Sequence, residues 1–328
     1  MPPSLRRGTV TAIVERFDEL ARIEVDGEPC VAYLRVTGPV ELGDEVIVNV
    51  QARELELGSG GFDVLYVNLT RGLDLAAAPD AHVMTLPYTP LQAAVRHVEE
   101  DGALAESLEG MPVVCCSLHS QLAPACAGIG DGLRVAYVQL SGGALPVSLS
   151  DSLRALKKRG LVELGIATGA CFDGDAQAVG VASALAWARA EGFAVAVCAV
   201  GPGIVGTASA LGHGGVSAAE AANAASALGG SPVLAVRVSE RDSRERHQGV
   251  SHHTRAVLDL AIGDVTVAWP SGLKAPDWLT VREEVDVAGW REACAGLPLE
   301  HMGRGADDDP WFFASAFAAG RLARGLAG

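Results

Sequence analysis

From residue 112 onward, the chain alternates short, uninterrupted apolar segments with longer segments of helical character, and this alternation constrains the fold most. The apolar segments lack the every-second-residue polarity of a strand that has one face in water. Strands of this kind are buried on both faces, and the intervening helices then connect parallel neighbours. The expected strands are residues 112–118, 134–140, 162–167, 193–200, 232–238 and 265–269, with an earlier one at 82–86.

The segments around these strands carry helix signals. Residues 150–159 are the clearest case, because Ser150 offers an N-cap and basic residues complement the C-terminal dipole. In the last helix, Asp309 is expected to cap the N-terminus and Pro310 to occupy the first position. The other expected helices are residues 91–100, 121–129, 176–190, 218–228, 254–262 and 310–326. We therefore predict an α/β domain over residues 76–328, a three-layer, Rossmann-like fold with a mainly parallel sheet flanked by helices.

Residues 1–75 follow a different pattern, with short segments that alternate in polarity. These segments are residues 8–14, 21–25, 30–36, 45–50 and 62–69. Asp26-Gly27 between the second and third is a two-residue hairpin signal. Short strands at this spacing predict a small SH3- or OB-like β-barrel, and the Ala/Asp/Pro-rich residues 73–81 are expected to link the two domains. Many acidic and few aromatic residues favour a docking or oligomerisation module over a nucleic-acid binder.

The charge balance argues against several classes of partner. The chain has 40 acidic and 25 basic residues, a formal net charge of −15, which disfavours nucleic acid and anionic membranes. No segment has the apolar length of a membrane span, and no signal peptide is visible at the start. The seven cysteines lack a framework spacing, and most lie in apolar segments. We therefore expect a cytoplasmic protein with buried, reduced thiols, and self-association through its alanine-rich helices stays open.

Residues 201–207 read Gly-Pro-Gly-Ile-Val-Gly-Thr directly after a predicted buried strand, in the spacing G-x-G-x-x-G. Glycines let backbone N–H groups approach an anion closely. A dinucleotide site also needs a helix directly after the glycines and a suitably placed acid, whereas here more glycines follow and Glu220 falls inside a predicted helix. We expect a ligand-contacting loop, and tight strand-to-helix packing is the alternative. The candidate ligand residues are Gly201, Gly203, Gly206, Thr207 and Gly212.

His213 lies among three glycines, which are expected to leave its ring exposed. Its pKa near neutrality suits proton transfer or ligand hydrogen bonding, and packing on the loop backbone is the alternative. Cys171 follows another predicted strand near the start of a predicted helix, a position that lowers a thiol pKa and favours a nucleophile. The alternative for Cys171 is a small residue that fills a loop. Asp173 and Asp175 are expected to cap the following helix, with metal binding as the alternative.

Residues 237–246 contain four arginines, and three of the eight histidines follow within residues 247–253. Arg244 and Arg246 suit an anion, and His247, His252 and His253 suit ligand hydrogen bonding or a metal. Adjacent residues of a helix point in different directions, so at most one of His252 and His253 is expected to face a metal. No zinc-type H-x-x-x-H or H-E-x-x-H pair is present. The alternative is a solvated charged loop in which Ser251 caps a helix.

These loops share one position, because each follows a predicted parallel strand. The carboxyl ends of parallel strands meet at one edge of the sheet, where open α/β folds bind ligands. We therefore expect Cys171, His213 and His252 to lie at the same edge as the candidate catalytic residues. The candidate ligand residues beside them are Arg244, Arg246, His247 and His253, together with the glycine loop.

The glycine segment, together with Arg-Glu-Arg-His-Gln-Gly at 244–249 and Ser-His-His-Thr at 251–254, resembles the bacterial family called domain of unknown function 3866. The resemblance covers the whole chain, barrel included. It implies no established activity, cofactor or catalytic residue.

Three functions stay open at this point. The first is binding of an anionic small molecule, a nucleotide, phosphate or carboxylate, with or without catalysis. The second is a non-enzymatic oligomeric scaffold or regulator. The third is a metal-dependent hydrolase that uses His213, His247 and Asp173.

Overall fold

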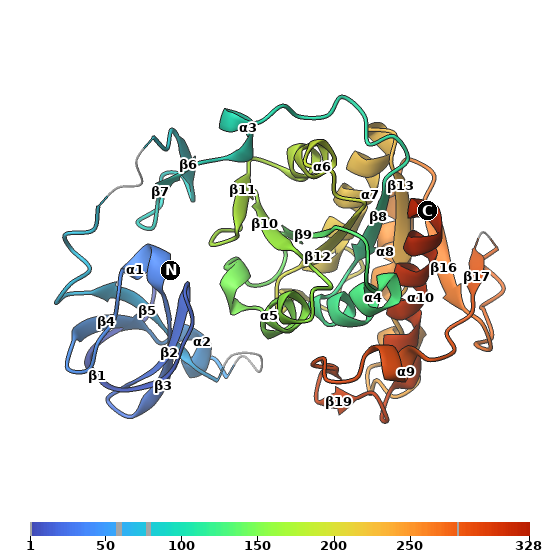
Figure 1. Cartoon of the computed structure of the whole chain (residues 1–328). Coiled ribbons are helices and arrows are strands. Elements are labelled where there is room, and N and C mark those ends of the chain that lie inside the picture. The colour runs from blue at the N-terminus through green and yellow to red at the C-terminus, as the bar shows by residue number, and fades with distance from the viewer. Residues whose placement is uncertain (1, 57–60, 77–79, 281) are drawn as a thin grey trace. The chain divides into compact units, whose positions relative to one another are not determined.

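The computed structural model describes residues 2–56, 61–76, 80–280 and 282–328. The chain forms two compact units, Met1–Arg96 and His97–Gly328 (Figure 1). No helix among the described residues is both long and apolar enough to cross a membrane. The predicted linker at residues 73–81 lies partly outside the described residues, at 77–79.

The first unit contains a closed five-stranded barrel, which confirms the predicted N-terminal β-barrel. Its order is β1-β2-β3-β5-β4, with β3 and β5 parallel and the other pairs antiparallel. Asp26 and Gly27 have φ values of 54° and 82° and form the expected hairpin turn. Residues 34–36, predicted as strand, belong to a short helix. The elements are β1 (Leu5–Arg16), β2 (Leu20–Val25), β3 (Glu28–Tyr33), α1 (Leu34–Thr37), β4 (Glu45–Asn49), α2 (Gln51–Glu54) and β5 (Asp63–Asn68).

Two predictions that follow the barrel are wrong. Residues 82–86 do not join the parallel sheet, because β6 (Val83–Thr85) forms an antiparallel hairpin with β7 (Ala93–Val95). The helix predicted at 91–100 is reduced to α3 (Val98–Asp101). Two prolines, at positions 87 and 90, lie in the turn and hold the chain out of helical geometry there.

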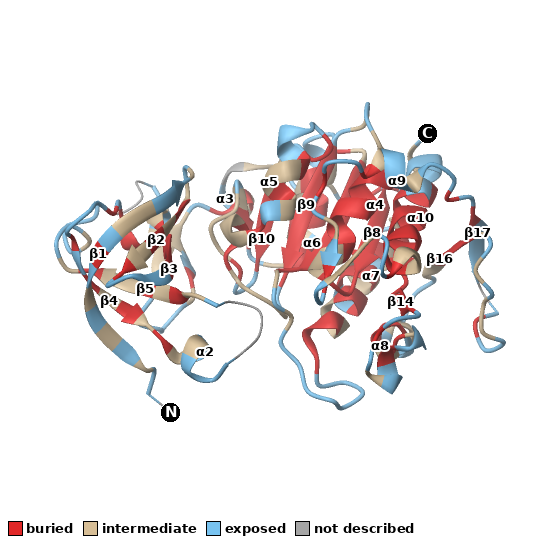
Figure 2. Ribbon diagram, turned by 90° about the horizontal axis from the view of Figure 1, so that it is seen from below, coloured by how far each residue is buried: buried red, intermediate tan, exposed pale blue. Residues whose placement is uncertain are grey.

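The second unit is built on an eight-stranded parallel sheet, which confirms the predicted fold class. The strands lie in the order β11-β10-β9-β12-β8-β13-β16-β17, so the first strand of the unit is central. Figure 2 shows that these central strands are buried, as expected for strands without polar alternation. The strands are β8 (Pro112–Cys116), β9 (Val135–Leu140), β10 (Leu164–Thr168), β11 (Ala176–Ala178), β12 (Val195–Val200), β13 (Ser231–Ala235), β16 (Thr266–Pro270) and β17 (Glu283–Val285).

Helices cover both faces of this sheet, in the three-layer arrangement that was predicted. Alternate residues of β8 point to opposite faces of the sheet, and each face has its own hydrophobic core. Val114 and Cys116 pack in one core, and Val113 and Cys115 pack in the other. The first face carries α4 (Leu122–Ile129), α5 (Asp151–Lys158), α9 (Trp290–Ala293) and α10 (Pro310–Ala327). The second carries α6 (Val181–Ala190), α7 (Ser217–Ala227) and α8 (His252–Leu260).

The two edge strands of the sheet, β11 and β17, were not predicted from the sequence. Residues 176–190 were expected to form one helix, but the first three pair with β10 and α6 begins only at Val181. Asp173 and Asp175 therefore cap no helix at Ala176. Asp175 instead accepts a hydrogen bond from the backbone N–H of Gly165 at 2.6 Å. A three-residue strand is too short to show a period in the sequence.

The helices α4 and α10 approach each other closely, because glycines lie where they meet. A Cβ atom at Gly320 would overlap the carbonyl oxygen of Ala125, and one at Gly128 would overlap that of Phe317. Pro310 occupies the first turn of α10 as predicted. The small residues of these helices therefore serve packing within the chain.

Candidate functional site

The carboxyl ends of the central strands form one edge of the sheet. Cys116 at the end of β8 lies opposite Ala199 of β12 and Ala235 of β13. The helix after β8, α4, packs on one face, whereas the helix after β13, α8, packs on the other. A parallel sheet leaves a ligand crevice where neighbouring strands send their connections to opposite faces. The residues that follow β8 and β13 therefore lie at the point of this sheet where the connections change face.

Arg237 lies just beyond the end of β13, and only 2% of it is exposed. Its backbone N–H donates to Thr254 Oγ1 at 2.9 Å, and its carbonyl oxygen accepts from the N–H of Ser251 at 2.9 Å. Gln121, in the connection after β8, donates to the carbonyl oxygen of Ala235 at 2.9 Å. These contacts fix the end of β13 from both sides and hold the buried guanidinium in place.

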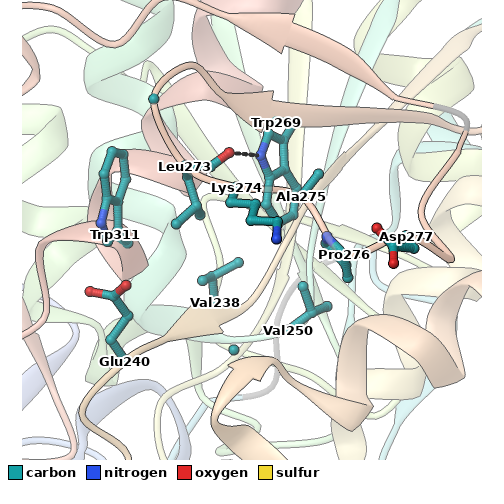
Figure 3. Close-up of a pocket in the computed structure, with 12 residues that line it drawn as sticks. Val238, Glu240, Val250, Trp269, Leu273, Lys274, Ala275, Pro276, Asp277 and Trp311 are labelled. Atoms are coloured by element: carbon teal, nitrogen blue, oxygen red, sulfur yellow. Dashed lines mark hydrogen bonds between the residues drawn. The ribbon is translucent and has the colours of Figure 1, made fainter.

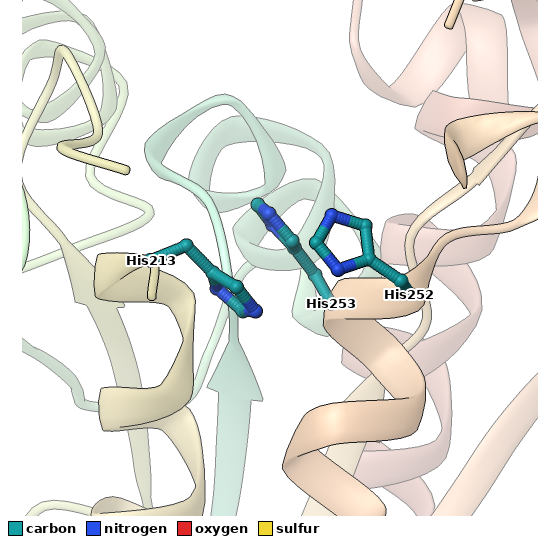
Figure 4. Close-up of side chains that lie close together, drawn as sticks. All are labelled: His213, His252 and His253. Atoms are coloured by element: carbon teal, nitrogen blue, oxygen red, sulfur yellow. The ribbon is translucent and has the colours of Figure 1, made fainter. Parts of the chain in front are cut away.

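Five histidines gather around this guanidinium, from the loop after β12, the connection after β13 and the C-terminal region. We name the group the histidine–arginine centre, which consists of His213, His247, His252, His253, His301 and Arg237. His213 stacks on His253 with ring centroids 3.6 Å apart. The ring of His252 lies 5.1 Å from that of His213 and 4.6 Å from that of His253. Figure 4 shows these three rings turned toward one another from two separate segments.

Hydrogen bonds define the tautomers of two of these rings. Arg237 Nη1 donates to His253 Nδ1 at 3.0 Å, and since a guanidinium only donates, this Nδ1 carries the lone pair. His213 Nε2 lies 3.0 Å from the carbonyl oxygen of Ala210, which only accepts, so Nε2 carries the proton. Three buried nitrogens have no hydrogen-bond partner within the described chain: His213 Nδ1, His252 Nε2 and Arg237 Nε. The centre therefore contains unused donor and acceptor capacity.

The structure corrects two predictions about these histidines. His252 and His253 both face the cluster, because they are the first residues of α8 and no preceding turn blocks their rings (Figure 4). His213 is buried, with 5% exposed, because the other imidazoles cover what its glycine neighbours leave open. Ser251 caps α8 through the N–H of His253, a cap that had been expected only in the alternative interpretation of this segment. The expectation that neighbouring residues of a helix point in different directions therefore does not hold for His252 and His253 at the start of α8.

Two buried carboxylates, those of Asp242 and Asp309, form ion pairs with the guanidiniums of this region. Asp242 accepts two hydrogen bonds from Arg244, at 2.9 and 2.8 Å, and one from Arg304 at 3.2 Å, and it lies 3.6 Å from Arg237 Nη2. Burial would raise the pKa of Asp242, but the hydrogen bonds from Arg244 hold it below its usual value. Asp309, predicted to cap α10, makes no capping bond and instead accepts from Arg304 at 3.3 Å. Three positive and two negative side chains leave a local positive excess in a chain of net charge −15.

Burial keeps the imidazoles of the centre neutral. It lowers the pKa of His247 and of His301 to about 3, and it lowers the pKa of the other three histidines in the same direction. The positive charge of Arg237 adds to each of these shifts. Burial lowers the pKa of Arg237 itself to about 9, so it stays charged at neutral pH. The centre then holds uncharged imidazoles beside one guanidinium.

We expect the free energy of unfolding to fall steeply as the pH drops from about 6.5 to 5. Histidines of the unfolded chain bind a proton near pH 6.5, whereas His247 and His301 stay neutral in the folded chain down to about pH 3. The contribution of each is complete above pH 6.5 and is lost at about 1.4 kcal/mol per pH unit as the pH falls toward 3. Urea unfolding at several pH values measures the slope, which should exceed one proton in this range. His301→Gln should lower the slope by about one proton, and a wild-type slope below one proton would contradict this.

The glycine loop of residues 201–212 is built for close backbone packing. No helix follows the glycines directly, since α7 begins only at Ser217. A Cβ atom at Gly201 would overlap the carbonyl oxygen of Ala144. Thr207 Oγ1 donates to the carbonyl oxygen of Gly212 at 3.1 Å, and Gly206 pairs with His213 in an isolated β-bridge. The loop therefore positions His213, and direct ligand contacts of its residues, including Gly203, stay a prediction.

Cys171 lies outside the histidine–arginine centre. It follows β10 and is fully buried, with its sulfur 4.0 Å from Ser141 Oγ. Burial raises the pKa of the Cys171 thiol, the opposite of the lowered pKa expected from its place near a strand end. Asp173, from the same loop, hydrogen-bonds to Ser148. Among the described residues, the one potential metal-binding group of three acids, cysteines or histidines is His213, His252 and His253, so Asp173 is not part of it.

Residues 29–320 match the family model described as protein of unknown function (DUF3866). The match contains all six residues of the histidine–arginine centre and, of the barrel, β3, β4 and β5; it begins after β1 and β2 and so does not cover the whole chain. The chain belongs to the DUF3866 family. No curated protein and no solved structure matches it. The predicted resemblance to this family is confirmed.

In this DUF3866 chain, sequence reasoning missed several residues that build the site. Arg237 was seen only as part of an arginine-rich segment, although a charge directly after an apolar strand is a signal of its own. His301 gave no signal, because it stands alone in the sequence. It stacks on Phe312 with ring centroids 4.0 Å apart, and its Nδ1 lies 3.1 Å from Ser120 Oγ. Contacts between such distant residues are set by the fold alone.

A hollow of about 580 Å³ lies beside the short hairpin of β14 (Val238–Ser239) and β15 (Gly249–Val250), which directly follows Arg237 and precedes Ser251. Figure 3 shows Trp269 at its wall, with Nε1 donating to the carbonyl oxygen of Leu273 at 2.8 Å. Trp311 and Lys274 also line it, and none of the histidines does. The hollow therefore borders the same connection as the centre without being part of it.

Proposed function

We propose that the histidine–arginine centre binds an anionic small molecule through a carboxylate or phosphate group. The observation that carries the proposal is the buried guanidinium of Arg237, whose Nε–H has no partner within the described chain. Buried donors nearly always have an acceptor, so an unpaired one where the connections of a parallel sheet change face supports a ligand oxygen at that place. The local positive excess supports the same charge for the ligand.

Arg246 supplies a second cation for this ligand. It is exposed, and neither a hydrogen bond nor an ion pair of its guanidinium occurs among the described residues. Its positive charge contributes to the lowered pKa of both Arg237 and His252, so it acts on the centre. Arg244, by contrast, is already paired with Asp242 on two hydrogen bonds. We therefore propose that the exposed Arg246 attracts the anion and that the buried Arg237 hydrogen-bonds to it.

The proposal includes a proton acceptor. His213 and His252 are neutral at pH 7, because burial lowers the pKa of both. A neutral imidazole accepts a proton or a hydrogen bond from a bound acid. His252 is the better candidate, since it is only partly buried and its Nε2 has no partner within the described chain.

We expect Arg246→Ala to weaken anion binding by about tenfold or more, because a hydrogen bond to a charged group contributes about 1.5–3 kcal/mol. Calorimetry with inorganic phosphate, nucleoside monophosphates and small carboxylates measures the affinity. Arg241→Ala is the matched control, because Arg241 is an exposed arginine of the same segment. If no anion binds, or if the two variants lose affinity equally, the proposal fails.

We further infer a cytoplasmic location. All seven cysteines are buried and free, which supports a reducing compartment. The net charge of −15 supports partners other than nucleic acid or anionic membranes. Self-association stays a prediction that light scattering tests.

A further inference from the structure

We propose that His213, His252 and His253 form a binding site for one divalent transition-metal ion of the zinc class. One nitrogen of each ring belongs to a group in which the ligand atoms lie within 4.8 Å of one another. Nitrogen ligands about 2.0–2.1 Å from a tetrahedral zinc ion are about 3.4 Å apart, so the side chains have to rotate to close the site. The proposal does not rest on anion binding.

His213 has the tautomer that a metal ligand needs. Its Nε2–H is directed to the carbonyl oxygen of Ala210, which leaves a lone pair on Nδ1. This Nδ1 is buried and has no partner in the described chain. A ligating histidine typically donates its other N–H to a carbonyl or carboxylate, which fixes the ring orientation. The hydrogen bond to Ala210 would fix the ring of His213 in this way.

His252 supplies the second ligand through Nε2, which is also buried and without a partner in the described chain. Its ring stands at 80° to that of His213, with centroids 5.1 Å apart. The two rings therefore meet edge to face and do not stack, so that two lone pairs can be directed to one point. Imidazole nitrogens are favoured ligands of zinc and its neighbours in the transition series.

His253 completes the site after one rearrangement. Its Nδ1 accepts from Arg237 at 3.0 Å, and its ring stacks on His213. Ligation through Nδ1 requires the ring to turn away from Arg237, which frees the guanidinium. A Cβ atom at Gly215 would lie 3.1 Å from His213 Nδ1 and 3.3 Å from His253 Nδ1, so only a glycine leaves this space open. Three histidines leave a fourth position for water or an anion, as in catalytic zinc sites.

The neutral imidazole rings favour metal binding at this site, whereas the nearby positive charges disfavour it. Burial lowers the pKa of all three histidines, so no proton has to leave before a metal binds at pH 7. The charged groups that face them are Arg237, Arg244 and Arg246 against Asp242. A metal cation beside these guanidiniums is disfavoured unless an anion takes the fourth position. Added phosphate should therefore strengthen metal binding.

Titration of the chelator-treated full chain with Co²⁺, followed by visible absorption and by competition with Zn²⁺, tests the proposal. We expect one ion per chain with the absorption of a tetrahedral site. His213→Gln and His252→Gln should each weaken binding by about 100-fold or more, since even outer-shell changes cost 10–100-fold. His119→Gln is the matched control, because His119 is a partly buried histidine outside the centre, with its ring nitrogens on the carbonyl oxygen of Val200 and on Ser150 Oγ. It should leave the affinity nearly unchanged.

Two readouts separate ligand loss from misfolding. Circular dichroism should show that the variants are folded, and NMR of the wild-type histidine rings with Zn²⁺ should show ligation at His213 Nδ1 without any substitution. Failure of the wild-type chain to bind a stoichiometric ion would overturn the proposal. So would equal weakening by His119→Gln and His213→Gln.

Discussion

Asp242→Asn is expected to lower the free energy of unfolding by about 3–5 kcal/mol, the usual result of leaving a buried charge without its partner. Only 1% of the Asp242 side chain is exposed, and three guanidiniums lie within 3.6 Å of it. An amide removes the negative charge and turns one oxygen acceptor into a donor that faces cations. The buried guanidinium of Arg237 would then lose the carboxylate of Asp242 that lies 3.6 Å from it. Equilibrium unfolding in guanidinium chloride at pH 7 measures the loss.

Asp307→Asn provides the matched control for this prediction. Asp307 pairs with Arg291 at 2.7 Å, but 96% of its side chain is exposed. Exposed ion pairs contribute little, because water and salt screen them. We expect the stability of this variant to stay close to that of the wild type. Equal losses in the two variants would mean that burial around Asp242 has no energetic role.

Gly320→Ala is expected to lower the free energy of unfolding by about 1–3 kcal/mol or more, as overpacking of a close-packed core does. The added methyl group would overlap the carbonyl oxygen of Ala125, so that α4 and α10 would have to move apart. Both helices are buried on the same face of the sheet, and α10 also contacts β8, β13 and β16. Thermal and chemical unfolding report the loss.

Gly325→Ala separates packing from helix propensity. Gly325 lies in the same helix, but nothing lies within 4 Å of the place where its Cβ would be. Alanine favours a helix over glycine by about 0.5–1 kcal/mol, so this variant should be slightly more stable than the wild type. Destabilisation by both substitutions would contradict the close contact between α4 and α10.

The three-layer arrangement of the second unit could be predicted from the polarity of short sequence segments. Apolar segments such as residues 112–118 and 193–200 predicted buried parallel strands because their polarity does not alternate. The order of the strands did not follow, because β12 inserts between β8 and β9 through contacts between distant residues. The edge strands β11 and β17 were missed, since three residues carry no measurable period.

The site was predictable in part. The rule that loops after parallel strands meet at one edge brought His213 and His252 together. It did not bring Cys171 to them, because an edge that spans eight strands is longer than one site. Arg237 and His301 could not be assigned, since their roles depend on contacts with residues far away in the chain. Burial, which decides their protonation, is likewise a property of the fold.

A crystal structure of the chain grown with inorganic phosphate tests the central claim most directly. Our account predicts the five histidines packed around Arg237, with an oxyanion at hydrogen-bond distance from Arg237 Nε or from the guanidinium of Arg246. Histidines dispersed over the surface, or phosphate bound only elsewhere while Arg237 Nε meets a protein acceptor, would contradict it.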